Sequence, residues 1–154
     1  MKIEHRIKVY LDTSVISALF DDRNPERKQL TAEFFRQAGN FEVSISELTT
    51  AELERTPDVS LREKMESVVA RFSVLPIAAD ADRLAREYVR HGAVPPDYAE
   101  DAYHIALAVT TGADFLLSWN FKHIVRRKTR DVVRMVNTMH GFGALEIMTP
   151  AELL

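Results

Sequence analysis

The stretch IKVYLDTS, residues 7–14, decides the fold of this chain. Its first five residues form a β-branched and aromatic run with a single lysine, which is typical of a strand. Asp12, Thr13 and Ser14 follow at once, and such residues end strands and cap helices. The stretch therefore predicts a strand that leads directly into a helix over about residues 14–20.

The alternation of strand and helix continues along the whole chain. Further strands are predicted over residues 41–45, 73–77, 114–119 and 145–148, and further helices over 25–38, 46–55, 60–71, 79–90, 95–111 and 122–140. Pro76 should shorten the third strand or confine it to a sheet edge. Helical segments long enough to cross over indicate a parallel sheet covered on both faces. We expect one three-layer α/β/α domain over residues 1–154, with a central parallel sheet of about five strands.

Composition narrows the class of protein. The 154 residues are 46% hydrophobic, enough for one sizeable core. The absence of cysteine excludes disulfides, Cys-ligated zinc, iron–sulfur clusters and thiol nucleophiles. Lys8 and Asp12 interrupt the first apolar stretch, so it is no signal-peptide core, and no run reaches the roughly 18 apolar residues of a membrane span. These features predict a soluble, cytoplasmic protein without a membrane partner.

Charge is distributed unevenly along the chain. The formal net charge of -3 argues against a generally cationic surface, but residues 122–134 carry six Lys or Arg against one Asp. A basic strip beside an acidic pocket suits phosphodiester chemistry, since the strip attracts a nucleic-acid backbone. Taken alone, the strip fits a solvated helix face better. The candidates for binding a nucleic-acid backbone are Lys122, Arg126, Arg127, Lys128 and Arg130.

Four oxygen-bearing side chains stand beside apolar elements. Asp12 and Asn120 follow the ends of predicted strands, while Glu52 and Asp101 lie on helices after the second strand and before the fourth. The ligand crevice of such a sheet lies beyond the carboxyl ends of its strands. Mg²⁺ takes oxygen ligands and is usually held by one or two carboxylates plus substrate phosphates. The pattern predicts a divalent-cation pocket for a nucleic acid or another phosphate ester.

Each of these residues also has a purely structural interpretation. Asp12 can be a helix N-cap, Glu52 a solvated side chain and Asn120 a turn residue. Asp101 differs, because apolar residues four and seven positions later place it at the margin of an apolar stripe. A carboxylate there should be partly buried, and a nearby cation would stabilise its charge. His104 is predicted to be a hydrogen-bonding packing residue, because the five histidines show no HExxH or closely paired spacing.

Two other carboxylate chemistries fit the first strand less well. A haloacid-dehalogenase nucleophile loop would carry a second Asp two residues after Asp12, where this chain has Ser14. A response-regulator acceptor would need an acidic pair at the end of the first strand, and the sequence has none there.

Four segments, YLDTSVI, ISELTTAEL, EDAYHIALA and GADFLLSWNF, together resemble the motifs of the PIN-domain family of metal-dependent ribonucleases, in particular the VapC-like toxins of toxin–antitoxin pairs. The resemblance spans residues 8–148 in the right order. It implies hydrolysis of RNA with Mg²⁺ or Mn²⁺, and Asp12, Glu52 and Asp101 as the catalytic, metal-binding carboxylates. Asn120 stands in the fourth position, where the family commonly has Asp, so we expect one well-occupied cation and a weak second site.

The resemblance also implies partners and leaves other functions open. Beside the RNA substrate, it implies an antitoxin protein. A PIN-like module could instead hold RNA or a protein without cutting it. A third alternative is an interaction subunit whose apolar helices, such as the one with Phe34 and Phe35, form a homodimer or clasp an antitoxin peptide. Retention of three acids favours catalysis over the binding module.

Overall fold

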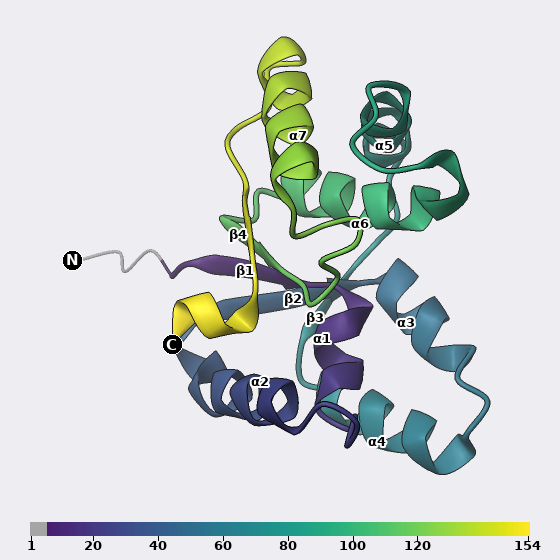
Figure 1. Ribbon diagram of the computed structural model, residues 1–154, viewed down its shortest axis with the longest axis vertical. Helices are drawn as coiled ribbons and strands as arrows, with labels where there is room; N and C mark the ends of the chain where they lie inside the picture. The colour runs from purple at the N-terminus through teal and green to yellow at the C-terminus, as the bar shows by residue number, and fades with distance from the viewer. Residues whose placement is uncertain (1–5) are drawn as a thin grey trace.

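The computed structural model describes residues 6–154 and has a five-stranded parallel sheet at its centre (Figure 1). The strands are β1 (Lys8–Leu11), β2 (Glu42–Ser46), β3 (Ser73–Leu75), β4 (Phe115–Leu117) and β5 (Glu146–Met148). Their order is β3-β2-β1-β4-β5, and every neighbouring pair is parallel. The strand read from residues 7–11 therefore forms the middle of the sheet.

Helices cover both faces of this sheet, so the expected three-layer α/β/α fold is confirmed. Helices α5 (Ala79–Arg90), α6 (Ala99–Thr110) and α7 (Arg127–Met139) lie on one face (Figure 1). Helices α1 (Thr13–Ala18), α2 (Pro25–Gln37) and α4 (Val59–Val69) lie on the other. Helix α3 (Glu47–Glu54) continues from the end of β2, and three short 3-10 helices are η1 (Ala38–Asn40), η2 (Pro96–Tyr98) and η3 (Pro150–Leu153).

Strand β1 contributes to both hydrophobic cores. Val9 and Leu11 belong to the core under α1, α2 and α4, whereas Tyr10 belongs to the core under α5, α6 and α7. This division follows from the alternation of side chains along a strand. All three side chains are fully buried, as expected for the middle strand of a parallel sheet with both faces covered.

Several element ends follow the sequence signals. Gly92 and Gly112 come just after α5 and α6 with φ angles of 83° and 78°, a left-handed conformation that favours glycine. Strand β3 lies at the sheet edge and ends before Pro76, because proline has no backbone N–H to donate to a neighbouring strand. Helix α4, however, begins earlier than predicted, because Asp58 rather than Ser60 is its N-cap and accepts the backbone N–H of Leu61 at 3.1 Å.

The largest difference from the sequence prediction lies after β4. The predicted helix over residues 122–140 begins only at Arg127, and residues 118–126 form a loop. In this loop the backbone N–H groups of Ile124 and Val125 both donate to the carbonyl of Asn120, at 3.1 and 2.8 Å. Both side chains are buried in the core beside α5, α6 and α7, which holds the turn in place.

The aromatic pair of α2 serves the core of its own chain. Phe34 is fully buried, and the partly buried Phe35 packs against Phe72 with ring centroids 6.0 Å apart. The pair therefore does not form the free apolar helix face that the sequence suggested, and a homodimer stays a prediction.

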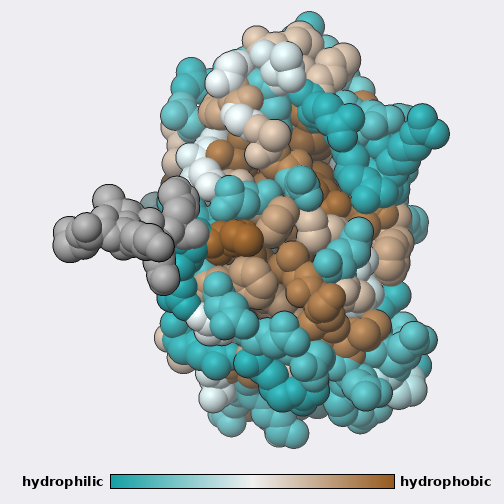
Figure 2. Space-filling view, turned by 90° about the vertical axis from the view of Figure 1, so that its left-hand side faces the viewer, coloured by the Kyte–Doolittle hydropathy of each residue, from teal (hydrophilic) through white to brown (hydrophobic). Residues whose placement is uncertain are grey.

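Figure 2 shows a face of the molecule on which hydrophobic residues gather in the middle, surrounded by hydrophilic ones. Within residues 6–154, no helix is long and apolar enough to span a membrane.

Candidate active site

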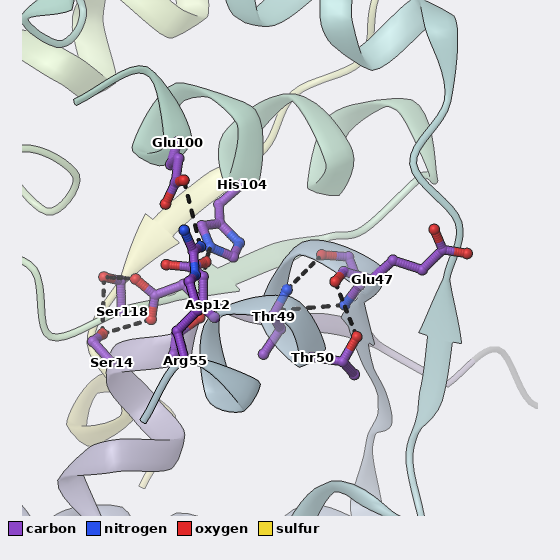
Figure 3. A network of polar contacts seen from close by, with 12 residues as sticks. Asp12, Ser14, Glu47, Thr49, Thr50, Arg55, Glu100, His104 and Ser118 are labelled. Atoms are coloured by element: carbon purple, nitrogen blue, oxygen red, sulfur yellow. Dashed lines mark hydrogen bonds and ion pairs between the residues drawn. The ribbon is translucent and has the colours of Figure 1, made fainter. Parts of the chain in front are cut away.

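The carboxyl ends of the central strands meet at one edge of the sheet, where four polar side chains come together. Asp12 follows β1, Glu52 comes from α3, and Asp101 and His104 come from the first turns of α6. Figure 3 shows Asp12 and His104 at this edge. His104 contacts Glu52 directly, and the charges of Asp12, Glu52 and His104 all act on the pKa of Asp101. The structure thus brings together the three carboxylates predicted from the sequence.

Asp12 is buried and held by two hydroxyl groups. Ser14 Oγ donates to Oδ1 at 2.5 Å, and Ser118 Oγ donates to Oδ2 at 2.6 Å. Asp12 occupies the N-cap position of α1, where its carboxylate makes no regular capping hydrogen bond, although the backbone N–H of Val15 in the first turn lowers its pKa. The N-cap interpretation therefore stays open beside the catalytic one. Burial raises the pKa of Asp12, while the charge of His104 and the two hydroxyl bonds act in the opposite direction.

The two serines are themselves fixed by the loop after β4. Ser14 Oγ accepts the backbone N–H of Trp119, and Ser118 Oγ accepts that of Asn120, each at 2.9 Å. Each hydroxyl therefore has a defined direction and donates its proton to Asp12. Neither serine was predicted from the sequence to be a site residue. The sequence shows only that one hydroxyl residue stands two positions after Asp12 and another stands at the end of a predicted strand.

Glu52 and His104 form a buried ion pair. His104 Nε2 donates to Glu52 Oε1 at 2.5 Å, and Nδ1 donates to Tyr10 Oη at 2.7 Å. Burial alone would lower the pKa of His104, but Tyr10, Glu52 and Asp12 together raise it far above its ordinary value. Burial alone would raise the pKa of Glu52, but the hydrogen bond and charge of His104 lower it. The raised pKa favours an imidazolium, which donates from both nitrogens.

The same hydrogen bonds tie this ion pair to the sheet. With His104 donating, Tyr10 Oη donates in turn to Ser46 Oγ at 2.7 Å, and Ser46 also caps α3 by accepting the N–H of Thr49. Thr13 Oγ1 donates to Glu52 Oε1 at 3.0 Å, so both bonds to the carboxylate reach the same oxygen. The prediction that His104 is a hydrogen-bonding packing residue is confirmed, and the solvated interpretation of Glu52 is wrong.

Asp101 and Asn120 lie side by side. Asp101 is partly buried, as predicted; burial raises its pKa to about 6, with Asp12 and Glu52 acting in the same direction, and His104 and a hydrogen bond from Asn120 acting against it. Asn120 Oδ1 accepts the backbone N–H of His123 at 2.9 Å, so the amide nitrogen is the group that faces Asp101. Asn120 is a turn residue and also a donor to the site, and its role as a fourth ligand stays a prediction.

An exposed ion pair flanks the site. Arg55 Nη2 lies 3.4 Å from Glu100 Oε1, which links the end of α3 to the first turn of α6 (Figure 3). Both side chains are more than half exposed, so the pair contributes little to stability. Arg55 also lowers the pKa of Glu52. Arg55 was not predicted from the sequence to be a site residue, although its positive charge could attract a phosphate toward the carboxylates.

Two residues of the basic strip have partners within the fold. Arg126 donates from Nε to Thr129 Oγ1 at 2.8 Å and from Nη2 to the carbonyl of Ala93 at 3.1 Å. The partly buried Arg130 donates to the carbonyl of Ile147 at 3.5 Å. These contacts hold α7 against the rest of the domain, so a role in RNA binding would compete with a structural one.

The other three RNA-binding candidates from the strip are exposed. Lys122 lies in the loop, with its ammonium group 5.8 Å from the ring centroid of Tyr98. Arg127 and Lys128 begin α7, and Arg127 forms a 3.6 Å ion pair with Asp131. The strip is therefore not one helix face, because the chain turns before α7 begins.

The donor chemistry of the site suits a hard divalent cation. Asp12, Glu52 and Asp101, when ionised, carry three negative charges against the single positive charge of His104, and one divalent cation would balance the remainder. Among residues 6–154, however, no group of three or more His, Asp or Glu side chains is arranged to hold a metal ion by itself. A cation here would be held by one or two carboxylates, with water and substrate phosphate completing its ligands.

Fold and site together define a parallel α/β protein with a carboxylate pocket at the carboxyl edge of its sheet. The family model of the PIN domain matches residues 9–123, and the chain belongs to the PIN domain family. The resemblance noted in the four sequence motifs is confirmed.

Two solved structures share this fold. The first is Mycobacterium tuberculosis VapC20, a sarcin-ricin loop cleaving toxin, with a TM-score of 0.57, 20% identity, and coverage of 75% of this chain and 92% of that one. The second is VapBC2 from Rickettsia felis bound to a DNA fragment from its promoter, with a TM-score of 0.57, 14% identity, and coverage of 92% and 97%. Among curated proteins, no sequence matches significantly.

Proposed function

We propose that this chain is a metal-dependent ribonuclease that hydrolyses RNA phosphodiester bonds, and that it is the toxin of a VapBC-type toxin–antitoxin pair. The observation that carries the proposal is the convergence of Asp12, Glu52 and Asp101 at the carboxyl edge of a PIN-domain sheet. The similarity to VapC20, a sarcin-ricin loop cleaving toxin, supports RNA as the substrate. The similarity to VapBC2 supports an antitoxin as the partner, and the cytoplasm is the proposed place of action.

The proposed roles follow from how each carboxylate is held. Asp12 and Asp101 would bind Mg²⁺ or Mn²⁺, with Glu52 helping directly or through water. When bound, the cation would supply an activated water and neutralise charge on the reacting phosphate. Asp12 keeps its direction through two hydroxyl donors, and Glu52 keeps its position through His104. Such fixed positions matter, because a small displacement of a catalytic group slows the reaction strongly.

Exposed cations beside the pocket are the proposed RNA-binding groups. Lys122, Arg127 and Lys128 are exposed on the surface, where they could meet a phosphate backbone, and the charge of Arg55 acts directly on Glu52. Arg126 and Arg130 are proposed to contribute mainly through the structure of α7.

A second candidate function is an RNA- or protein-binding module with weak catalysis. Asn120 favours it, because its neutral amide lacks the charge of an aspartate and its oxygen already accepts the backbone N–H of His123. The two functions differ in one respect that can be measured: the ribonuclease cleaves RNA only with a divalent cation, and the module binds RNA without cleaving it.

The proposal is tested by incubating the purified protein with single-stranded and structured RNAs in Mn²⁺, Mg²⁺ or chelator. We expect cleavage with either cation and none in chelator. Asp12→Asn and Asp101→Asn should each abolish it, because loss of either carboxylate weakens cation binding and misplaces the water. Asp22→Asn is the matched control, since Asp22 is exposed and pairs with Lys28 on the surface. Unchanged cleavage by folded Asp12→Asn protein would sink the proposal.

A further inference from the structure

Three side chains form a second group next to the carboxylates: Tyr98, Lys122 and His123, here named the Tyr98 platform. Tyr98 immediately precedes α6, three residues before Asp101. Its ring stacks on the ring of His123, with centroids 4.1 Å apart and planes at 33°. The ammonium group of Lys122 lies 5.8 Å from the Tyr98 ring centroid, within reach of a cation–π interaction. An aromatic face, a cation and an imidazole therefore stand together.

The platform is joined to the carboxylates through one residue. The backbone N–H of His123 donates to Asn120 Oδ1 at 2.9 Å, and the Asn120 side chain bonds to Asp101. A chain that places one phosphate at the carboxylates would therefore bring a neighbouring nucleotide to Tyr98. This geometry favours a ligand that continues from the pocket, as a nucleic-acid strand does.

Burial within the platform is unusual for polar groups. His123 is only 6% exposed, yet neither of its ring nitrogens has a hydrogen-bond partner among residues 6–154. Buried polar atoms in folded proteins almost always have a partner, so two such nitrogens in one ring call for an explanation. Burial, Lys122 and Arg126 lower the pKa of His123, which favours the neutral ring. Its contact with the Tyr98 ring points to a supporting role, in which the imidazole fixes the position of an exposed aromatic side chain.

Tyr98 is the exposed part of the platform. Its side chain is 45% exposed although it is large and aromatic, and its ring contacts His123 and the flexible side chain of Lys122. An exposed aromatic ring can stack with an unpaired base, whereas the bases of a duplex have no free face to offer. Lys122 beside it can pair with the phosphate of the same nucleotide.

We propose that the Tyr98 platform binds one unpaired nucleotide of single-stranded RNA, whose base stacks on Tyr98 and whose phosphate pairs with Lys122. The inference rests on the ribonuclease proposal, because it names the substrate class of the same site. Tyr98 and Lys122 are binding residues, and His123 is a positioning residue that supports the Tyr98 ring.

The test measures binding of a short single-stranded RNA by fluorescence anisotropy in the Asp12→Asn background with chelator, where no cleavage interferes. Tyr98→Leu should weaken binding about tenfold, within the range found for loss of one base–aromatic stack. Tyr98→Phe should restore most of the affinity, because it keeps the ring. Tyr103→Leu is the matched control: it is the same change on the neighbouring helix α6, at a residue that faces α5.

Two further arms separate stacking from other causes. A double-stranded RNA of the same length should bind equally to the Tyr98→Leu and Tyr98→Phe proteins. His123→Phe keeps a ring under Tyr98 and removes both nitrogens, so it should lower affinity for single-stranded RNA less than Tyr98→Leu does. Equal binding by the Tyr98→Leu and Tyr103→Leu proteins would overturn the inference, as would a parallel loss on the duplex.

Failure of the platform is distinguishable from failure of the ribonuclease proposal. Cation-dependent cleavage by the wild-type protein, combined with no effect of Tyr98→Leu on binding, overturns the platform and leaves the ribonuclease proposal standing. Tyr98-dependent binding without any cleavage supports the platform and overturns the ribonuclease proposal. Absence of RNA binding by the wild-type protein overturns the platform.

Discussion

Asn120 shows how one side chain sets the charge of the site. It faces Asp101 with its amide nitrogen, while its oxygen accepts the N–H of His123. Asn120→Asp would add a carboxylate beside Asp101, which should tighten Mn²⁺ binding and lower the concentration needed for half-maximal cleavage. Asn120→Ala should raise that concentration without abolishing activity. Isothermal titration with Mn²⁺ checks both, and an unchanged titration for Asn120→Asp would mean that residue 120 only shapes the turn.

Asp101 gives the metal site its pH dependence. Its pKa of about 6 means that a proton occupies the carboxyl below that pH, so a cation must displace it. We expect Mn²⁺ affinity to fall by roughly tenfold per pH unit below about pH 6, because one proton is released on binding. Asp101→Asn should flatten this dependence in a Mn²⁺ titration at several pH values. A profile as steep in that variant as in the wild type would assign the proton to another group.

The raised pKa of Asp101 makes lower pH stabilise the metal-free fold, although lower pH weakens Mn²⁺ binding. Because Asp101 has a folded-state pKa above the unfolded value of about 3.9, its protonation stabilises the fold. This contribution is fully present below about pH 4 and is lost as the pH rises through about 6. Denaturant titrations of wild-type and Asp101→Asn proteins in chelator measure it together with the coupling of Asp101 to Asp12, Glu52 and His104, since groups remote from the site titrate equally in both. The advantage of the asparagine variant should grow from pH 4 to pH 7, and a constant difference would contradict this.

Single residues also mark the limit of prediction from the sequence. Asp12, Glu52 and Asp101 could be found, because each carboxylate stands next to a recognisable strand or helix. Ser118 could not be found from the sequence, because it lies 106 positions from Asp12 and no local pattern indicates a contact between residues so far apart. Arg55 was missed for the same reason, since it meets Glu100 only in the folded chain.

At the scale of elements, the ion pair of Glu52 and His104 joins α3 to α6. His104 is almost fully buried and Glu52 is mostly so. Glu52→Gln would leave a buried imidazolium without its counter-charge, and we expect it to lower the free energy of unfolding by roughly 2 to 3 kcal/mol, below the full range for buried pairs because Glu52 keeps some exposure. Urea denaturation checks the value. Glu54→Gln, an exposed residue on the same helix, is the control and should be nearly neutral.

Element boundaries were predictable where a local rule acts. The parallel sheet followed from the alternation of strands and helices, and Pro76 correctly predicted a short edge strand. The start of α7 was not predictable, because the loop after β4 is held by two N–H bonds to the carbonyl of Asn120 and by burial of Ile124 and Val125. Helical periodicity in the sequence carries no information about such a turn.

Across the whole molecule, we expect the uneven charge to guide the approach of the proposed RNA substrate. Replacing Lys122, Arg127 and Lys128 by Gln should reduce the slope of log K against log salt by about 2 on single-stranded RNA, at roughly 0.7 per phosphate contact. Single-turnover cleavage at saturating RNA should stay nearly intact, because none of the three lies among the carboxylates. Anisotropy at several salt concentrations checks the slope. An unchanged slope would make these residues a solvated surface.

The central claim is that a divalent cation at the carboxylates of Asp12 and Asp101 drives RNA cleavage. The most direct test is single-turnover cleavage of one RNA across a Mn²⁺ titration, for wild-type, Asp12→Asn and Asp22→Asn proteins with matched folding by circular dichroism. The account predicts saturable activation of the wild-type and Asp22→Asn proteins, and no cleavage by Asp12→Asn at any Mn²⁺ concentration. Cleavage that persists in chelator, or an Asp12→Asn protein as active as the wild type, would contradict it.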